Sequence, residues 1–318
     1  MEKLFYELIQ VSTGQLDCLS RGPEPEEWQE LHEMARHQHM IGICYHGVKQ
    51  LFEFGLRVPQ DLVIDWMAEA ETVQESNLVM DQRSVKVLQM MAEQNIRASI
   101  LMGQGIARDY GELRSLRYPD HIDICTDSSL ERLLEVANPI NDGYSDSDYR
   151  LVHLNQWNDV DVRLHYEIGI GKNPLKNKRI RQWLKKNQEL LFVKDGDMVR
   201  PSVRLNVILV LIEIYWKFLY QRITLREMTD YFFTLRKVAA SGKKGVDYEK
   251  ILRKIGLLSF AQGVMWVMQE VYGLKEEALV TMPSEHQGSF ILKDILAGKH
   301  HILHLLMRYP MELLFSRF

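Results

Sequence analysis

The stretch "RYPDHIDICTD", residues 117–127, decides the fold because its centre has the pattern of a β-strand. In "HIDIC" (121–125) polar and apolar residues alternate, as they do in a strand with one buried face. His121 and Asp123 therefore share one face of the predicted strand, and Ile122 and Ile124 share the other. The two polar side chains are the first candidates for a functional site.

The residues around this strand, from about 96 to 170, predict a small sheet. Short apolar runs alternate there with clusters of Gly, Pro, Asn and Asp, and "SSLERLLEVA" (128–137) predicts a helix behind a serine cap. We expect neighbouring strands at 98–102, 121–125 and 158–166. The flanking sequence has helical periodicity. The prediction is an α+β fold in three regions, which are N-terminal helices (1–95), an α/β core with a mixed sheet (96–170) and a C-terminal helical bundle (171–318).

Composition and charge exclude several classes of protein. The chain has 318 residues and a net charge of −4, so a generally basic, nucleic-acid-binding surface is not expected. Its three cysteines form no CxxC pair, which favours a reducing, cytoplasmic setting over a disulfide framework. The apolar run "VILVLI" (207–212) is far too short to span a membrane, and the first ten residues lack the apolar core of a signal peptide.

The polar faces of two predicted strands supply candidate metal ligands. An aspartate placed like Asp123 is typical of magnesium sites in phosphate-transfer folds, although a second carboxylate is usual where this chain has His121. Imidazole suits softer metals than magnesium and brings no negative charge. In "NDVDVRLHYEI" (158–168), Asp161 and Arg163 lie on one face of the next strand. Asp161 could therefore join Asp123 as a ligand or simply pair with Arg163.

Two further features point to phosphate binding or to ordinary structure. Gly103, Gln104 and Gly105 follow a predicted strand and precede a short helix, where backbone N–H groups can approach a phosphate. A plain tight turn is the alternative. Arg226 and Asp230 stand one helical turn apart, so they could form an exposed pair or lie together at a cleft.

The chain resembles a bacterial family of uncharacterised nucleotidyltransferases, a branch of the DNA polymerase beta-like superfamily common in Bacteroidetes. The resemblance rests on "ILMGQGIARDY" (100–110), Arg117, "DHID" (120–123), His153, "RLH" (163–165) and "RITLREMTDYFFTL" (222–235). The upstream segment "EMARHQHMIGICYHGV" (33–48) fits the helical part of the family. Three motif positions depart from its pattern, since Met102 replaces a lysine, His121 an aspartate and Arg163 a glutamate.

The resemblance implies a site for a nucleoside triphosphate and Mg²⁺, with transfer of a nucleotidyl group to a small-molecule, sugar or protein acceptor. It implies catalytic roles for Asp123 and Asp161, with His121 as a further metal ligand. The implied nucleotide-binding residues are Gly103, Gln104, Gly105, Arg117 and Arg226. The three departures disfavour the two-metal reaction, because they remove negative charge and add a cation. The alternative is a pseudoenzyme, a degenerate nucleotide- or partner-binding module with weak or absent Mg²⁺ binding.

Overall fold

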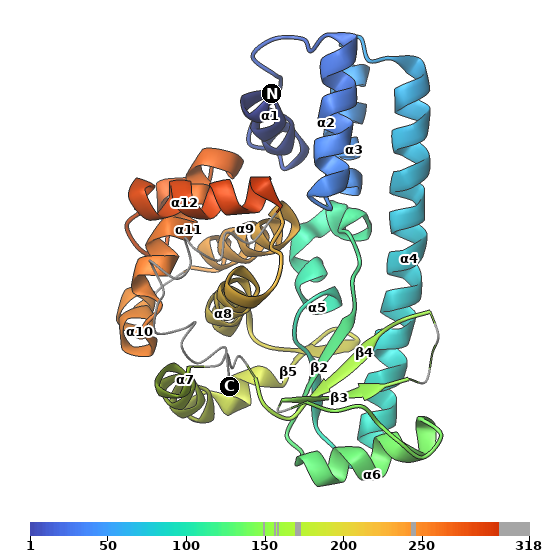
Figure 1. Cartoon of the computed structure of the whole chain (residues 1–318), viewed down its shortest axis with the longest axis vertical. Coiled ribbons are helices and arrows are strands. Elements are labelled where there is room, and N and C mark those ends of the chain that lie inside the picture. Colours follow the sequence, from blue (N-terminus) through green and yellow to red (C-terminus); the bar gives the residue numbers. More distant parts are fainter. Residues whose placement is uncertain (149, 156, 158, 169–172, 243–245, 299–318) are drawn as a thin grey trace.

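The computed structural model describes residues 1–148, 150–155, 157, 159–168, 173–242 and 246–298. Its N-terminal part consists of helices joined by short loops, and the long fourth helix runs from them to the sheet (Figure 1). These elements are α1 (Glu2–Ser12), α2 (Pro25–His37), α3 (Ile41–Glu53) and α4 (Gln60–Glu93).

Helix α4 ties the N-terminal helices to the sheet through one continuous buried stripe. Its buried residues recur every three or four positions, which is the period of a helix packed on one side. Trp66 and Ala70 belong to the larger hydrophobic core, whereas Met80, Val87 and Met91 belong to a second core beneath the sheet. One helix therefore packs against both parts of the molecule.

The sheet confirms the α+β prediction and the neighbouring placement of the three expected strands. Its strands are β1 (Ala98–Ile100), β2 (Ile122–Thr126), β3 (Leu151–Leu154) and β4 (Val162–His165), in the order β1-β2-β4-β3. β2 runs parallel to β4, and the other two pairs are antiparallel, so the sheet is mixed. Asp123 lies opposite Arg163 in the register. Helix α6 (Leu130–Ile140) covers this end of the molecule and is capped by Ser129, as the sequence predicts.

Two details differ from the sequence prediction. The strand expected from 158 begins only at Val162, because Asp159 turns toward α4 and pairs with Arg83 at 2.9 Å; residue 158 lies outside the described residues. The region from 171 onward is not purely helical, since β5 (Val193–Asp195) and β6 (Met198–Arg200) form a hairpin. Gly196 takes the positive φ of +65° that its turn requires.

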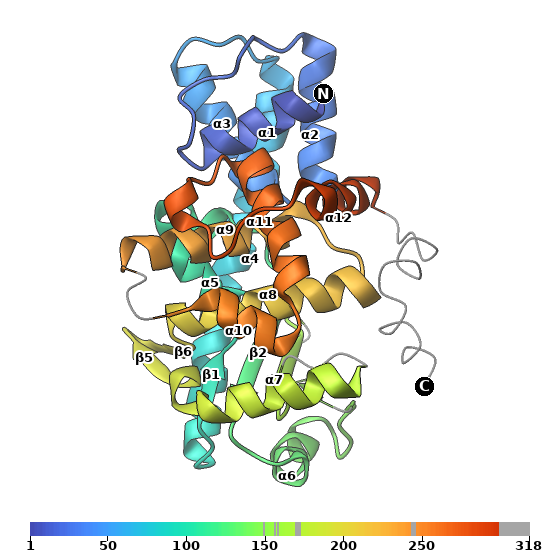
Figure 2. The same ribbon diagram turned by 90° about the vertical axis from the view of Figure 1, so that its left-hand side faces the viewer.

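The remaining helices pack on one another beside the sheet. They are α5 (Gln104–Ala107), α7 (Pro174–Lys186), α8 (Val203–Tyr220), α9 (Leu225–Ala240), α10 (Tyr248–Ile255), α11 (Leu258–Tyr272) and α12 (Glu285–Ala297), with 3-10 segments η1 (Arg108–Leu116), η2 (Gln188–Leu191) and η3 (Glu276–Ala278). In Figure 2, α8 lies across the molecule between the strands below it and α11 and α12 above it. α8 is buried on nearly all sides, as expected for a helix that is apolar all round. No helix within the described ranges is both long and apolar enough to cross a membrane.

Candidate functional site

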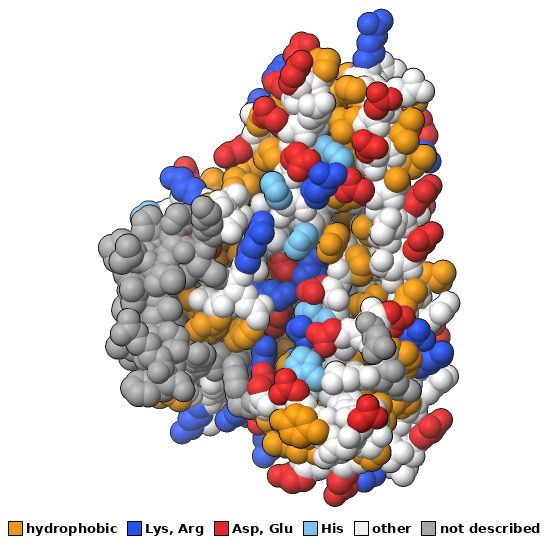
Figure 3. All heavy atoms as spheres, turned by 45° about the vertical axis from the view of Figure 1, so that its right-hand side comes forward, with side chains coloured by type: hydrophobic (Ala, Val, Ile, Leu, Met, Phe, Trp, Pro, Cys, Tyr) orange, Lys and Arg blue, Asp and Glu red, His pale blue; other side chains and the backbone are white. Residues whose placement is uncertain are grey.

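A narrow cleft lies where the start of β2 faces helices α8 and α9. It consists of two small hollows of about 30 Å³ each, which share five lining residues: Met102, His121, Asp123, Glu213 and Lys217. Figure 3 shows acidic, basic and histidine side chains crowded together in the hollow on this face of the molecule. A volume of about 30 Å³ holds one or two water molecules, whereas small-molecule sites usually measure about 300 Å³ or more.

Both carboxylate oxygens of Asp123 are occupied by imidazole rings. Nε2 of His165 lies 2.7 Å from Oδ1, and Nε2 of His121 lies 2.8 Å from Oδ2. The Asp123 side chain is only 9% exposed. Burial alone raises the pKa of the Asp123 carboxyl, but the charge and hydrogen bonds of the two histidines hold it well below its usual range. Asp123 is therefore an anion with one imidazole donor on each of its two oxygens.

His121 is a cation at neutral pH. Its second nitrogen, Nδ1, lies 3.0 Å from Oδ2 of Asp120, so a carboxylate faces each side of the ring. Burial lowers the pKa of His121, but Asp123 and Asp120 raise it more strongly, to about 9. Nη1 of Arg163 lies 3.1 Å from Nε2 of His121, so two cations lie close together. The carboxylate of Asp161 compensates the charge of Arg163, since its Oδ2 accepts from the Arg163 Nε at 2.8 Å.

This arrangement does not fit a magnesium ion. Magnesium requires oxygen ligands in near-octahedral geometry, and both oxygens of Asp123 already accept hydrogen bonds. Asp161 pairs with Arg163 and with His153, and it does not line the cleft. Throughout the described ranges, no three His, Cys, Asp or Glu side chains gather as metal ligands would. The cationic groups of His121 and Arg163 stand beside Asp123, where they repel a dication.

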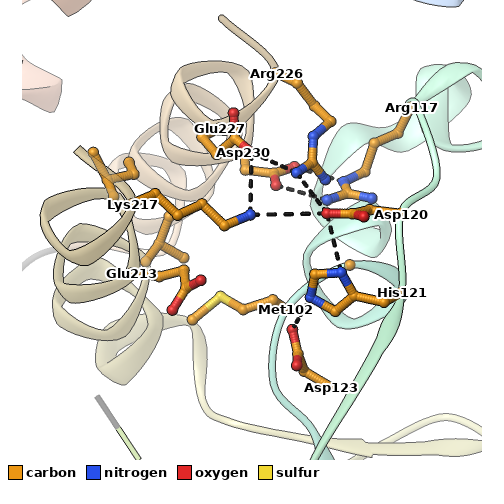
Figure 4. Close-up of a pocket in the computed structure, with 13 residues that line it drawn as sticks. Met102, Arg117, Asp120, His121, Asp123, Glu213, Lys217, Arg226, Glu227 and Asp230 are labelled. Carbon is orange, nitrogen blue, oxygen red and sulfur yellow. Dashed lines mark hydrogen bonds and ion pairs between the residues drawn. The ribbon is translucent and has the colours of Figure 1, made fainter. Parts of the chain in front are cut away.

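Helices α8 and α9 bring two more cations into the cleft, as Figure 4 shows. Nη2 of Arg226 lies 3.1 Å from Oδ2 of Asp120, and Nζ of Lys217 lies 3.8 Å from the same oxygen. Both cations also contact Glu227, with Lys217 at 3.2 Å. Burial raises the pKa of the Glu227 carboxyl, but Arg226 and Lys217 lower that pKa by more, so Glu227 remains ionised. These ion pairs join the helices to the loop that precedes β2.

Arg117 holds α9 against the core through a bidentate ion pair. Its Nε and Nη2 donate to the two oxygens of Asp230 at 2.7 and 2.8 Å, and the Tyr110 hydroxyl donates to Oδ1 at 2.6 Å. The Arg117 side chain is 2% exposed. Arg226 and Asp230 therefore lie at the cleft, which is the second of the two placements considered from sequence. They do not form an ion pair with each other: Asp230 pairs with Arg117, and Arg226 pairs with Asp120 and Glu227.

In the turn formed by residues 103–105, Gln104 and Gly105 have structural roles. The N–H of Gly105 donates to the Met102 carbonyl, and a Cβ at Gly105 would lie 2.5 Å from the Ile100 carbonyl oxygen. The Gln104 side chain is buried and donates to Asp81 on α4 at 2.9 Å. Gly103 has a φ of +54° and lines the cleft.

The structure thus brings together most of the residues that were selected from sequence. The cleft is lined by Gly103, Arg117, His121, Asp123 and Arg226, whereas Gln104, Gly105 and Asp161 lie outside its lining. Sequence reasoning missed Glu213 and Lys217 on α8 and gave no role to Asp120. A signal for the first two exists, because they are charged residues inside a helix that is otherwise almost wholly apolar.

The comparison with protein families identifies the chain. The sequence model of a family described as "Uncharacterised nucleotidyltransferase" matches residues 24–273. The chain belongs to this family. Neither the characterised proteins nor the solved structures that were searched gave a significant match. The matched range contains strands β1 to β6 and both helices of the cleft, so the nucleotidyltransferase assignment applies to the part of the chain that carries the site.

Proposed function

We propose that this member of the nucleotidyltransferase family binds a nucleoside triphosphate without a divalent metal and does not perform metal-dependent nucleotidyl transfer. Membership of the family supports nucleotide binding. The observation that carries the rest is the state of Asp123, whose two oxygens accept from His121 and His165 at 2.8 and 2.7 Å. A metal at Asp123 would have to share these oxygens with two imidazole rings, one of which is itself protonated.

The charges of the cleft support binding of phosphate without a metal. In a two-metal nucleotidyltransferase, the ions neutralise the triphosphate. The cleft is lined by the cationic side chains of Arg150, Arg163, Lys217 and Arg226 and by protonated His121, which can take that role when phosphate replaces carboxylates that now pair with them. Lysine and arginine are the usual side-chain partners of phosphate in proteins. The chain itself can therefore supply the positive charge that a metal would otherwise bring.

The proposal is tested by measuring the melting temperature with each of the four common NTPs, once with Mg²⁺ and once with EDTA, because a ligand that binds only the folded state raises its stability. We expect the same shift with either addition and no release of pyrophosphate. The variant Met102→Lys/His121→Asp/Arg163→Glu restores the family pattern at the three departed positions. Its NTP binding should become dependent on Mg²⁺.

Met102→Lys alone is the matched control. It adds the lysine but leaves Asp123 bonded to both histidines, so its NTP binding should stay independent of Mg²⁺. Tight, strictly Mg²⁺-dependent binding with pyrophosphate release by the unaltered chain would overturn the proposal. Asp123 and Asp161 would then suffice for transfer to a small-molecule, sugar or protein acceptor.

A further inference from the structure

One carboxylate oxygen in the cleft is surrounded by three cations from three elements. Oδ2 of Asp120 lies 3.0 Å from Nδ1 of His121, 3.1 Å from Nη2 of Arg226 and 3.8 Å from Nζ of Lys217 (Figure 4). His121 lies just before β2, Arg226 lies on α9 and Lys217 lies on α8. A phosphate oxygen is bound in proteins by the same kinds of group, with lysine as a point charge and arginine as a directed donor.

The two carboxylates that face these cations differ in how firmly they are held. Glu227 is buried, and its side chain also accepts from the backbone N–H and the hydroxyl of Thr224 in the capping box of α9. Burial raises the pKa of the Asp120 carboxyl, but His121, Arg226 and Lys217 hold it well below its usual range; its side chain is nevertheless 45% exposed and lies in the loop before β2, so water can replace these contacts when it moves. Moving Asp120 toward solvent therefore costs less than moving Glu227.

The cleft also contains a donor that no group accepts. Nε of Arg226 is buried and has no hydrogen-bond partner among the described residues, although its Nη2 is shared by Asp120 and Glu227. The Arg226 side chain is only 6% exposed. A buried N–H group without an acceptor costs free energy, so an additional anion at this point would be stabilised.

We propose that Lys217, Arg226 and His121 form a phosphate-binding subsite, and that Asp120 occupies it until a phosphate group displaces its carboxylate. This inference rests on the proposed function and names the side chains that would hold the nucleotide phosphates. Because Asp120 lines the hollow, departure of its side chain would leave a phosphate group the place that the carboxylate now fills. Lys217 supplies to the cleft the ammonium group that Met102 lacks.

The experiment compares Asp120→Asn with the unaltered chain by calorimetric titration of pyrophosphate and of ATP in the presence of EDTA. The asparagine side chain keeps the size of the aspartate but removes the competing charge. We expect the Kd for both ligands to fall about tenfold, which corresponds to about 1.4 kcal/mol. In the double variant Asp120→Asn/Lys217→Met this gain should be lost, because the ammonium group is missing.

Asp159→Asn is the matched control. Asp159 also pairs with an arginine, its side chain is 47% exposed, and the substitution makes the same change in net charge away from the cleft. It should leave both dissociation constants unchanged. Equal or weaker binding by Asp120→Asn, with the unaltered chain binding normally, would overturn the subsite but not the proposed function. Absence of binding by both proteins would overturn both, whereas binding by Asp120→Asn alone would support the subsite.

Discussion

The ion pair between Arg117 and Asp230 allows a quantitative test of how the helical region is held to the core. Replacing Arg117 by Met removes two hydrogen bonds of 2.7 and 2.8 Å and leaves the Asp230 carboxylate, which is 9% exposed, without its main partner. Breaking a buried ion pair on one side typically costs about 3–5 kcal/mol. The Tyr110 hydroxyl and the charge of Arg226 remain near Asp230, so we expect the lower end, about 3 kcal/mol.

The assay is equilibrium unfolding in urea, followed by tryptophan fluorescence and by far-UV circular dichroism. Arg117→Met/Asp230→Asn should be about 2 kcal/mol less destabilised than the sum of the two single variants, because no buried charge is left unpaired. Arg114→Met is the control, since Arg114 and Asp81 form a pair of 2.7 Å that is about one-third exposed and should contribute at most about 1 kcal/mol.

The reasoning is refuted if Arg117→Met costs no more than the Arg114 control, or if the effects of the two substitutions simply add. Either result would mean that Arg117 does not hold α9 in place. The guanidinium would then be free for the nucleotide-binding role that the family resemblance implies. A large coupling energy assigns Arg117 to positioning the wall of the cleft.

Two further outcomes are expected from packing and from titration. Gly105→Ala should lower the free energy of unfolding by about 1–3 kcal/mol, because its Cβ would meet the Ile100 carbonyl at 2.5 Å. Gly22→Ala is the control, since a Cβ there meets only the tip of a leucine side chain. Equal effects of the two substitutions would contradict the packing argument. The folded-state pKa of His121 is about 9, above its unfolded value of about 6.5, so its contribution is complete below about pH 6.5 and is lost as the pH rises to 9. Unfolding free energy should therefore fall by about 3 kcal/mol more over this window in the unaltered chain than in His121→Gln, and parallel pH profiles would show that the imidazolium is not stabilising.

Local sequence patterns were sufficient to place the sheet, but they did not reveal every strand. The alternation in "HIDIC" and in "VRLH" predicted β2 and β4, whose apolar faces lie in the core beneath the sheet. The expectation of one exposed face was wrong for β2, because all five of its residues are buried. The β5–β6 hairpin was missed, although its Gly196-Asp197 turn is a recognised hairpin signal. Each strand has only three residues, which is too short for a period of two to stand out from the helical sequence around it.

The cleft was harder to predict because long-range ion pairs replaced the local ones that the sequence suggests. Arg226 and Asp230 have the spacing of an exposed helical pair, which contributes about 0.3–0.5 kcal/mol. A buried bidentate ion pair stabilises Asp230 more strongly than an exposed helical pair does, so Asp230 accepts from Arg117, and Arg226 donates to Asp120. Both partners lie more than 100 residues away in the chain, and no local rule selects them.

Lys217 also forms long-range contacts in place of a local one. Lys217 lies one helical turn from Glu213 on α8, yet its ammonium group contacts Glu227 on the next helix and faces Asp120 in the loop before β2. The lysine missing at position 102 is thus matched by one that enters the same cleft from a different element. A cation needs only to reach the cleft, whereas a metal ligand must also keep a lone pair free and a fixed angle. In this cleft Lys217 brings positive charge from α8, while the oxygens of Asp123 accept from His121 and His165.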